Sequence, residues 1–198
     1  MIYLIDHEDS FTYNLAHLLD SIEPTFVSNY YEIDQTKLEK SSTIVLSPGP
    51  GEPKDYPLTT KIYNKYKGKK KILGICLGFQ QIVFCEGAKI VQQKNILHGY
   101  QSHIKVTNNK SIFKKNFNFL GGRYHSLKMA EPFVSQSMII TMRCVKTNVA
   151  MAVEDDINKV YGLQFHPDSF LTPHGKYLIK KILSPVSYTH LRAHETDL

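Results

Sequence analysis

The sequence predicts an α/β protein with one domain, built on a mostly parallel, doubly wound sheet of the flavodoxin-like type. Short apolar runs, rich in branched residues, have the length of buried strands. Helical apolar patterns separate these runs through the first half of the chain. Strands that alternate with helices are typical of parallel sheets that carry helices on both faces. We therefore expect the functional residues at the carboxyl ends of the strands.

Length and composition suit a single cytoplasmic domain. The chain has 198 residues, of which 42% are hydrophobic and 21% charged, enough to bury a sizeable core. No stretch has the length of a membrane span, and an apolar run at residues 2–5 leaves no room for a secretory signal. Cys76, Cys85 and Cys144 show no metal-ligand spacing. We expect free thiols, a reducing compartment, and neither a metal nor another cofactor.

The formal net charge of +6 raises the question of nucleic-acid binding. Much of the excess comes from lysines shortly before the strand at 72–75, namely Lys61, Lys65, Lys67, Lys69, Lys70 and Lys71. No aromatic platform, zinc-ligand spacing or helix-turn-helix pattern accompanies them. The lysines are therefore interpreted as a solvated helix end and loop.

The first half contains the alternating elements. The predicted strands cover residues 2–5, 24–27, 43–46 and 72–75. Asp9 or Ser10 can cap a first helix whose apolar stripe is Phe11, Leu15, Leu18 and Leu19. A second helix is predicted at about 57–66. Between the third strand and this helix, the sequence Ser47-Pro48-Gly49-Pro50-Gly51 imposes a rigid, irregular loop.

The second half is richer in strands, which we expect to extend the sheet. Strands are predicted at 89–92, 102–106, 138–144, 150–153 and 160–165, and a last helix at about 174–183. The domain is therefore placed at residues 1–183. Residues 184–198 have little core periodicity and are interpreted as a tail, either disordered or non-native, outside the fold.

Cys76 lies where the strand at 72–75 passes into a helical pattern without a loop. Gly74 and Gly78 flank it in a Gly-x-Cys-x-Gly pattern, which is the nucleophile elbow with Cys in place of Ser. The turn is so tight that only small flanking residues fit, and the nearby helix N-terminus stabilises a thiolate. The alternative is a buried structural cysteine. The two glycines and the abrupt change from strand to helix favour a nucleophile.

His166 is the best-placed base for such a thiol. It directly follows the strand at 160–165, at the same sheet edge as Cys76. Asp168 stands two residues further on, where a carboxylate can accept the second imidazole N–H and complete a triad. The alternative is a turn histidine followed by a helix-capping aspartate.

An acyl-transfer site also needs donors for the developing oxyanion. The backbone N–H of Leu77, directly after the nucleophile, is the usual first donor of an elbow. Gly51 is a reasonable second donor, because no side chain obstructs its N–H. The alternative for this Pro- and Gly-rich loop is a plain rigid turn.

Several segments resemble motifs of the class I glutamine amidotransferases, in the same order and at similar spacing. The resemblance covers about residues 1–183. The segments are Asp9-Ser10-Phe11-Thr12-Tyr13-Asn14-Leu15, Ser47 to Gly51, Gly74 to Gly78, His98-Gly99, Tyr124-His125-Ser126-Leu127, and Gly162-Leu163-Gln164-Phe165-His166-Pro167-Asp168-Ser169. Within the family, the chain is most similar to the small subunits of anthranilate synthase and aminodeoxychorismate synthase. The resemblance implies that family's fold.

The resemblance also implies an activity. Cys76 would attack the side-chain amide of glutamine, His166 would protonate the departing ammonia, and water would hydrolyse the thioester. Ammonia would pass to a chorismate-using partner subunit. By the same resemblance, Gly49, Pro50 and Gly51 line the glutamine and oxyanion site. Gln80, Ser126 and Leu127 would hold the α-amino and carboxylate ends of glutamine. His98-Gly99 and His125 would be structural or subunit-facing.

Two residues depart from the family pattern. The family usually has Glu at the position of Asp168, so this carboxylate is one methylene closer to the backbone. It commonly has His at the position of Phe79, a residue that the proposed chemistry does not need. We expect lowered activity at worst, because neither change removes the nucleophile or the base.

Two other hypotheses compete with a glutaminase subunit. One is an independent cysteine hydrolase on the same type of sheet, which Gln80, Ser126 and Leu127 disfavour because they match a glutamine pocket. The other is a catalytically weak scaffold that regulates its partner, which the intact Cys76, His166 and Asp168 disfavour. The sequence separates neither the anthranilate from the aminodeoxychorismate pathway nor one stoichiometry from another.

Overall fold

The computed structural model describes residues 1–94 and 98–184. Its helices are α1 (Thr12–Asp20), α2 (Gln35–Lys40), the short η1 (Pro53–Asp55), α3 (Pro57–Tyr66), α4 (Leu77–Cys85) and α5 (Gly175–Leu183). Its strands are β1 (Ile2–Asp6), β2 (Thr25–Asn29), β3 (Thr43–Leu46), β4 (Lys71–Ile75), β5 (Ile90–Gln92), β6 (Tyr100–Val106), β7 (Asn118–Arg123), β8 (Leu127–Met129), β9 (Ile139–Cys144), β10 (Ala150–Asp155) and β11 (Val160–Leu163).

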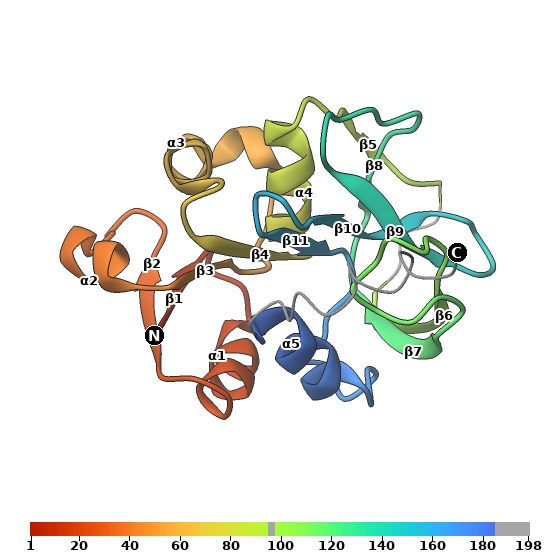
Figure 1. Ribbon diagram of the computed structural model, residues 1–198, viewed down its shortest axis with the longest axis horizontal. Coiled ribbons are helices and arrows are strands. Elements are labelled where there is room, and N and C mark those ends of the chain that lie inside the picture. The colour runs from red at the N-terminus through yellow and green to blue at the C-terminus, as the bar shows by residue number, and fades with distance from the viewer. Residues whose placement is uncertain (95–97, 185–198) are drawn as a thin grey trace, which may run out of the picture.

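A nine-stranded sheet runs through the molecule in the order β2-β1-β3-β4-β11-β10-β9-β6-β7 (Figure 1). The five strands from β2 to β11 pair in parallel. The strands β10, β9, β6 and β7 continue the sheet with antiparallel pairing. The predicted fold is therefore confirmed: a doubly wound sheet with added strands in the C-terminal half.

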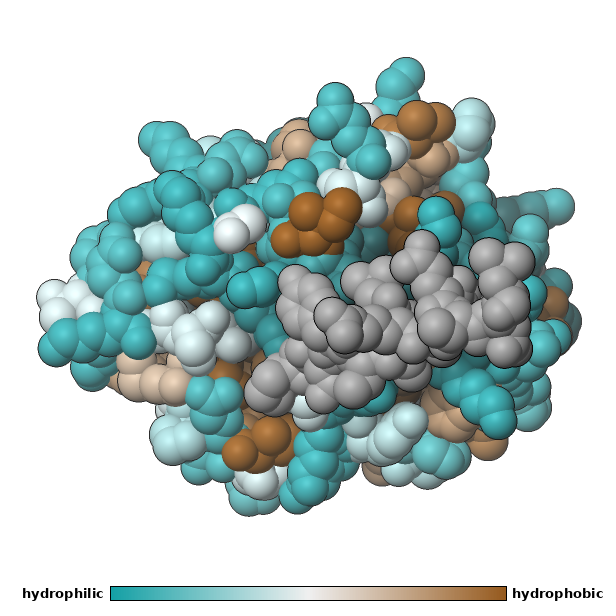
Figure 2. Space-filling model, viewed as in Figure 1, coloured by the Kyte–Doolittle hydropathy of each residue, from teal (hydrophilic) through white to brown (hydrophobic). Residues whose placement is uncertain are grey.

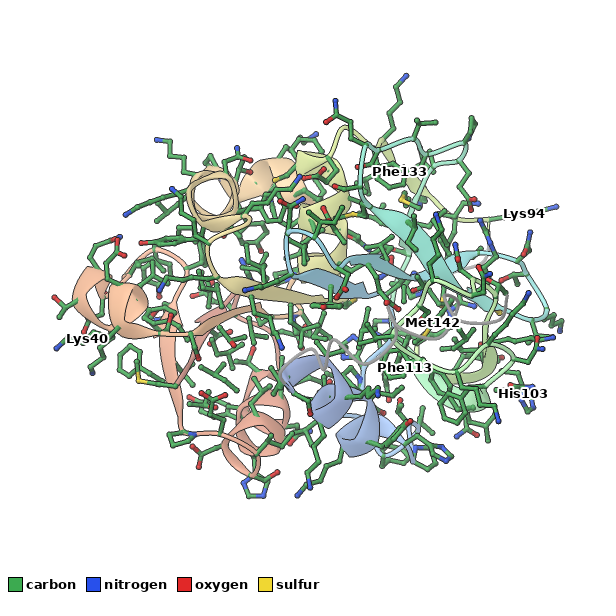
Figure 3. The ribbon with its side chains drawn as sticks, in the orientation of Figure 1. Lys40, Lys94, His103, Phe113, Phe133 and Met142 are labelled. Atoms are coloured by element: carbon green, nitrogen blue, oxygen red, sulfur yellow. The ribbon has the colours of Figure 1, made fainter. Side chains whose placement is uncertain are left out.

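Helices cover both faces of the parallel part of the sheet (Figure 1). Alternate side chains of one strand point to opposite faces, so Ile2 and Leu4 join the core beneath α1 and α5, whereas Tyr3 and Ile5 join the core beneath α2, α3 and α4. Phe113 and Met142 extend the first core below the antiparallel strands, and Phe133 packs against the second core (Figure 3).

Four elements were not predicted. The short η1 has only three residues, and each of the other three has its own physical reason. Strand β7 contains Gly121 and Gly122, which weaken a strand signal. A Cβ atom on Gly121 would lie 2.5 Å from Ile104 Cδ1, so packing requires the glycine. Strand β8 has three residues and pairs only with β5 in a separate two-stranded sheet. Helix α2 has six residues, and its start is set by Asp34, which accepts a hydrogen bond from the Lys37 N–H at 3.0 Å.

Several predicted boundaries were wrong by two residues, namely the end of β2, the start of β6 and the ends of β10 and β11. The predicted start of α1 was wrong as well. Helix α1 begins after Phe11, which makes no side-chain cap. Asp9 instead accepts a hydrogen bond from the Phe11 N–H at 2.7 Å, a local turn that precedes the helix. Strand β11 ends at Leu163, two residues before the predicted end. His166 is nevertheless held in line, because its N–H donates to the carbonyl oxygen of Gly122 at 2.9 Å.

The view in Figure 2 shows a largely hydrophilic face with hydrophobic residues in small, separate groups. No helix in the described part of the chain has the length and apolarity needed to cross a membrane. Apart from Ser184, the predicted tail at 184–198 lies outside the described residues.

Candidate active site

Cys76 sits on a strained turn between β4 and α4. Its backbone has φ 53° and ψ −100°, a conformation that a residue with a side chain rarely adopts. The flanking glycines make the turn possible. A Cβ atom on Gly74 would lie 2.3 Å from the carbonyl oxygen of Gly78, and one on Gly78 would lie 2.2 Å from that of Leu46. The structure thus gives Cys76 the elbow geometry that the sequence pattern predicts.

The loop from Ser47 to Gly51 is held on both sides. Ser47 Oγ accepts a hydrogen bond from the His7 N–H at 2.8 Å, and the Tyr56 hydroxyl donates to the carbonyl oxygen of Pro50 at 2.8 Å. Gly51 has φ +74°, in the left-handed region that favours glycine. The loop is therefore a fixed rim beside the elbow, as a site for a developing oxyanion requires.

A pocket of about 340 Å³ opens above the elbow. It is lined by Glu8, Asp9, Ser10, Gly49, Pro50, Gly51, Cys76, Leu77, Gln80, His98, Tyr124, His125, Ser126 and Leu127. The nucleophile, both expected oxyanion donors and the whole expected glutamine-binding set thus meet in one pocket. Two carboxylates belong to the lining and no lysine or arginine does, so the lining is complementary to an ammonium group.

Sequence reasoning left several lining residues unassigned. Glu8, Asp9 and Ser10 follow β1 after one intervening residue, His7, and this position at a strand's carboxyl end could have identified them. Tyr124 also lines the pocket, while its hydroxyl lies 3.0 Å from Ser169 Oγ. These side chains bring the segment after β1 and the segment after β7 into the same site.

His166 lies behind this pocket and is not part of its lining. Its ring packs against two aromatic rings that also contact each other, with centroid distances of 5.3 Å to Phe11 and 4.9 Å to Tyr124. Its Nδ1 is 3.7 Å from Asp168 Oδ1, too far for a hydrogen bond. Neither ring nitrogen of His166 and neither carboxylate oxygen of Asp168 has a hydrogen-bond partner. The predicted hydrogen bond within this dyad is therefore absent here, as the shorter aspartate side chain would explain.

At pH 7 the electrostatics keep the Cys76 thiol and the His166 imidazole neutral and leave Asp168 partly protonated. Burial, and secondarily the Asp9 charge, raises the pKa of the Cys76 thiol to about 12, although the Leu77 N–H and the Gln164 amide act in the opposite direction. Burial, and secondarily His125, lowers the pKa of His166 to about 3. Burial is also the main cause that raises the pKa of Asp168 to about 7. Proton transfer from thiol to imidazole would have to occur during the attack.

His125 is held in one tautomer by its neighbours. Arg123 Nε donates to His125 Nε2 at 3.0 Å, and His125 Nδ1 lies 2.8 Å from the carbonyl oxygen of Leu127. Because Arg is a pure donor, Nε2 must accept and Nδ1 must carry the proton. Burial, and secondarily the Arg123 charge, lowers the pKa of His125 to about 4. His125 therefore serves as a fixed support for Leu127 at the pocket wall.

A second, larger hollow of about 450 Å³ is unrelated to this chemistry. It is lined by Lys67, Glu86, Val134, Ser135, Gln136, Ser137 and Asn158, without a thiol or an imidazole. Across residues 1–94 and 98–184, no group of three or more His, Cys, Asp or Glu side chains could hold a metal ion. The pocket at Cys76 is therefore the candidate active site.

The fold and the sequence were compared with known proteins. A solved glutamine amidotransferase from Thermotoga maritima superposes with a TM-score of 0.67 at 18% identity, covering 84% of this chain and 75% of that one. At that identity the likeness concerns the fold alone.

Relatives at higher identity share most of the chain. The anthranilate synthase component 2 of Lactococcus lactis is 36% identical over 189 residues, which are 94% of this chain and 96% of that protein. The bifunctional protein TrpGD of Thermotoga maritima is 35% identical over 189 residues, and the match spans 92% of this chain but only 32% of that longer protein. The family model of class I glutamine amidotransferases matches residues 3–185. This chain therefore belongs to the class I glutamine amidotransferase family.

Proposed function

We propose that this chain is the glutaminase component of a two-subunit synthase, in which it releases ammonia from glutamine for a chorismate-using partner. The observation that carries the proposal is the strained elbow at Cys76, which opens into a pocket lined by the expected glutamine-binding residues. Relatives named anthranilate synthase component 2 support tryptophan synthesis as the pathway. Service to an aminodeoxychorismate synthase remains part of the proposal.

In the proposed reaction, the Cys76 sulfur attacks the side-chain amide carbon of glutamine while its proton passes to His166. The backbone N–H groups of Leu77 and Gly51 hold the oxyanion. As the C–N bond breaks, His166 gives its proton to the nitrogen, which leaves as ammonia. Water then gives a proton to His166 and attacks the thioester carbon, which releases glutamate and restores the thiol. These reaction steps need no cofactor bound to this chain.

Glutamine recognition is assigned to the rest of the lining. Gln80 Nε2 donates to the carbonyl oxygen of Leu127 at 3.3 Å, so helix α4 and the segment at 126–127 form one wall. We assign the α-amino and carboxylate groups of glutamine to Gln80, Ser126 and Leu127. The carboxylates of Glu8 and Asp9 add a negative potential that suits the α-ammonium group.

We expect the isolated chain to have little activity. The thiol and the imidazole are both neutral, and Asp168 stops short of His166. Partner binding would therefore have to bring the dyad together and lower the cost of forming the ion pair. This expectation accounts for a glutaminase that does not waste glutamine when its partner is absent.

The test is glutamate release from glutamine, measured with the chain alone and then with each candidate chorismate-using subunit. Strong stimulation by one partner, together with glutamine-dependent product formation, would support the proposal and identify the pathway. Complex formation without glutamate release would favour a regulatory scaffold, for which the open His166–Asp168 contact is the motivating observation. Release from unrelated amides or peptides without a partner would favour an independent cysteine hydrolase.

A further inference from the structure

Gln164 is a buried polar residue that the reaction described above does not use. It follows β11 and has no exposed surface. Its backbone is fixed, because its N–H donates to the carbonyl oxygen of Met151 at 2.9 Å. One residue earlier, the carbonyl oxygen of Leu163 accepts the Cys76 N–H at 2.8 Å. The register between β4 and β11 thus places Gln164 beside the nucleophile.

The side chain of Gln164 bridges Cys76 and Gln80. Its Nε2 donates to the Cys76 sulfur at 3.8 Å, within the range of a weak hydrogen bond to sulfur, and its Oε1 accepts from Gln80 Nε2 at 3.3 Å. The direction of this bridge matters, because an amide turned by 180° would present an acceptor to the sulfur.

The surrounding network fixes that direction. Arg123 can only donate, so His125 accepts at Nε2 and donates from Nδ1 to the carbonyl oxygen of Leu127. That carbonyl is an acceptor, and therefore the Gln80 amide must turn its NH₂ group toward it. The second hydrogen of the same NH₂ group then reaches Gln164 Oε1. The only end of the Gln164 amide left to face the sulfur is the donor.

We propose that Gln164 is a positioning residue of the nucleophile, whose amide, oriented through Gln80, donates to the Cys76 sulfur and stabilises the thiolate that forms during the attack. The proposal deepens the function proposed above, since it rests on Cys76 as the nucleophile. It also leaves Oε1 as the one atom of the Gln80 amide free to meet a ligand, because both amide hydrogens are engaged. Substrate recognition by Gln80 and activation of Cys76 would then be linked by one series of hydrogen bonds, from Gln80 through Gln164 to the sulfur.

The experiment compares Gln164→Leu and Gln164→Glu with the unchanged chain. The measured quantity is the rate constant for alkylation of Cys76 by iodoacetamide between pH 7 and 9, followed by peptide mass mapping to separate Cys76 from the other two thiols. Because only the thiolate reacts, loss of the donor should slow alkylation by about tenfold at each pH, which corresponds to about one pKa unit. Gln164→Glu, nearly identical in shape, should be slowed at least as much at the upper end of this pH range, where its carboxyl group is ionised and only accepts.

Gln81→Leu is the matched control. Gln81 is also a buried glutamine, on α4. Its Nε2 donates to Thr60 Oγ1 at 2.7 Å and takes no part in the hydrogen bonds that join Gln80, Gln164 and Cys76. This control should leave the Cys76 rate constant unchanged. A general loosening of the packing would expose the thiol and speed its alkylation, which is the opposite of the expected effect.

Alkylation at the unchanged rate in both Gln164 variants would overturn the proposal, as would faster alkylation. If Gln164→Leu does not fold, the Gln164→Glu rate constant alone decides. The assay contains neither glutamine nor a partner, so it is independent of glutaminase activity. Slower alkylation in an inactive protein would refute the proposed function but support the inference, and the reverse result would refute only the inference.

Discussion

The nucleophile and the base of the candidate site are built in different ways. Around Cys76, steric contacts leave no freedom: Gly74 and Gly78 have no room for a Cβ atom, and the Cys76 N–H is bonded to Leu163. Around His166, the backbone is fixed by Gly122, but the polar atoms of the ring and of Asp168 have no partners.

This difference indicates which part of the site the fold completes by itself. The elbow is a consequence of packing and should persist in any folded form of the chain. The dyad of His166 and Asp168 is buried and its side chains have no hydrogen-bond partners, and such groups are costly to leave unsatisfied. Its completion is therefore the step that we assign to the partner subunit or the substrate. Four predictions test this comparison.

The largest effect is expected for Cys76→Ser. Loss of the thiol should lower glutamine-dependent synthesis by at least about a thousandfold, because removal of a catalytic nucleophile typically costs that much or more. Synthesis from added ammonia should remain largely intact in the complex. The measurement is product formation by the complex with each nitrogen source, and equal loss with both would contradict the proposed division of labour.

Gly78→Ala should damage folding rather than chemistry. The added Cβ atom would lie 2.2 Å from the carbonyl oxygen of Leu46, a backbone atom that cannot rotate away. We expect a loss of about 3 kcal/mol in the free energy of unfolding, at the upper end for overpacking. Urea denaturation measures it. Gly87→Ala is the matched control for an exposed glycine, since a Cβ atom there meets nothing within 4 Å, though its φ of +91° adds some backbone strain of its own. Equal losses of unfolding free energy in both variants would show that the close contact at Gly78 is not what requires a glycine there.

Asp168→Asn should separate activity from stability. Burial raises the pKa of Asp168 from 3.8 to about 7. The folded state then binds the proton more tightly than the unfolded state, and this contribution to stability is lost as the pH rises from about 4 to 7. At pH 8 the variant should therefore unfold at higher urea concentration than the unchanged chain, whereas the advantage should vanish near pH 4.

The same variant should lower partner-stimulated glutamate release by up to about 10⁴-fold, the cost of asparagine in a fully bonded triad, because we assign closure of the 3.7 Å gap to the partner. A loss of only about tenfold would indicate that the gap stays open in the complex. Asp168→Glu, which restores the missing methylene, should keep or raise the activity. Lower stability of Asp168→Asn at pH 8 would show that the carboxylate is paired in solution.

The last prediction, for His125→Gln, concerns no loss of activity and only the pH dependence of the free energy of unfolding. The pKa of His125 is lowered from 6.5 to about 4, so between these values only the unfolded chain gains the proton. The unchanged chain should thus lose stability relative to the variant as the pH falls from 6.5 to 4, by up to about 1.4 kcal/mol per pH unit. Parallel stability curves for the two proteins would show that His125 is solvated and not held by Arg123.

The elements that the sequence predicts well are those with a clear apolar period, such as β1, β3, β4 and α5. Strand β7 escaped prediction because Gly121 and Gly122 carry no side chain, and their requirement arises from Ile104 and from Ser169 and Leu171, residues distant in the sequence. Contacts between distant segments cannot be deduced from a local pattern.

The same limit applies to the site. The elbow at Cys76 was predictable because its pattern is local and steric. The gap between His166 and Asp168 was not, because it depends on side-chain length and on the packing of Phe11 and Tyr124. Gln164 belongs to the segment 162–169 that resembles the family. Its contact with the Cys76 sulfur nevertheless depends on β4 and β11 being neighbours in the sheet, which a single motif cannot predict.

The position of β11 has a consequence for the order of events on the ribosome. Among the described strands β11 comes last in the sequence, yet it lies between β4 and β10 in the middle of the sheet. Until Leu163 has left the exit tunnel, the elbow strand has an open edge and Cys76 lacks the backbone bond that aligns it. A nascent chain that stops before β11 thus cannot align Cys76, and the thiol is set in place only when β11 joins the sheet.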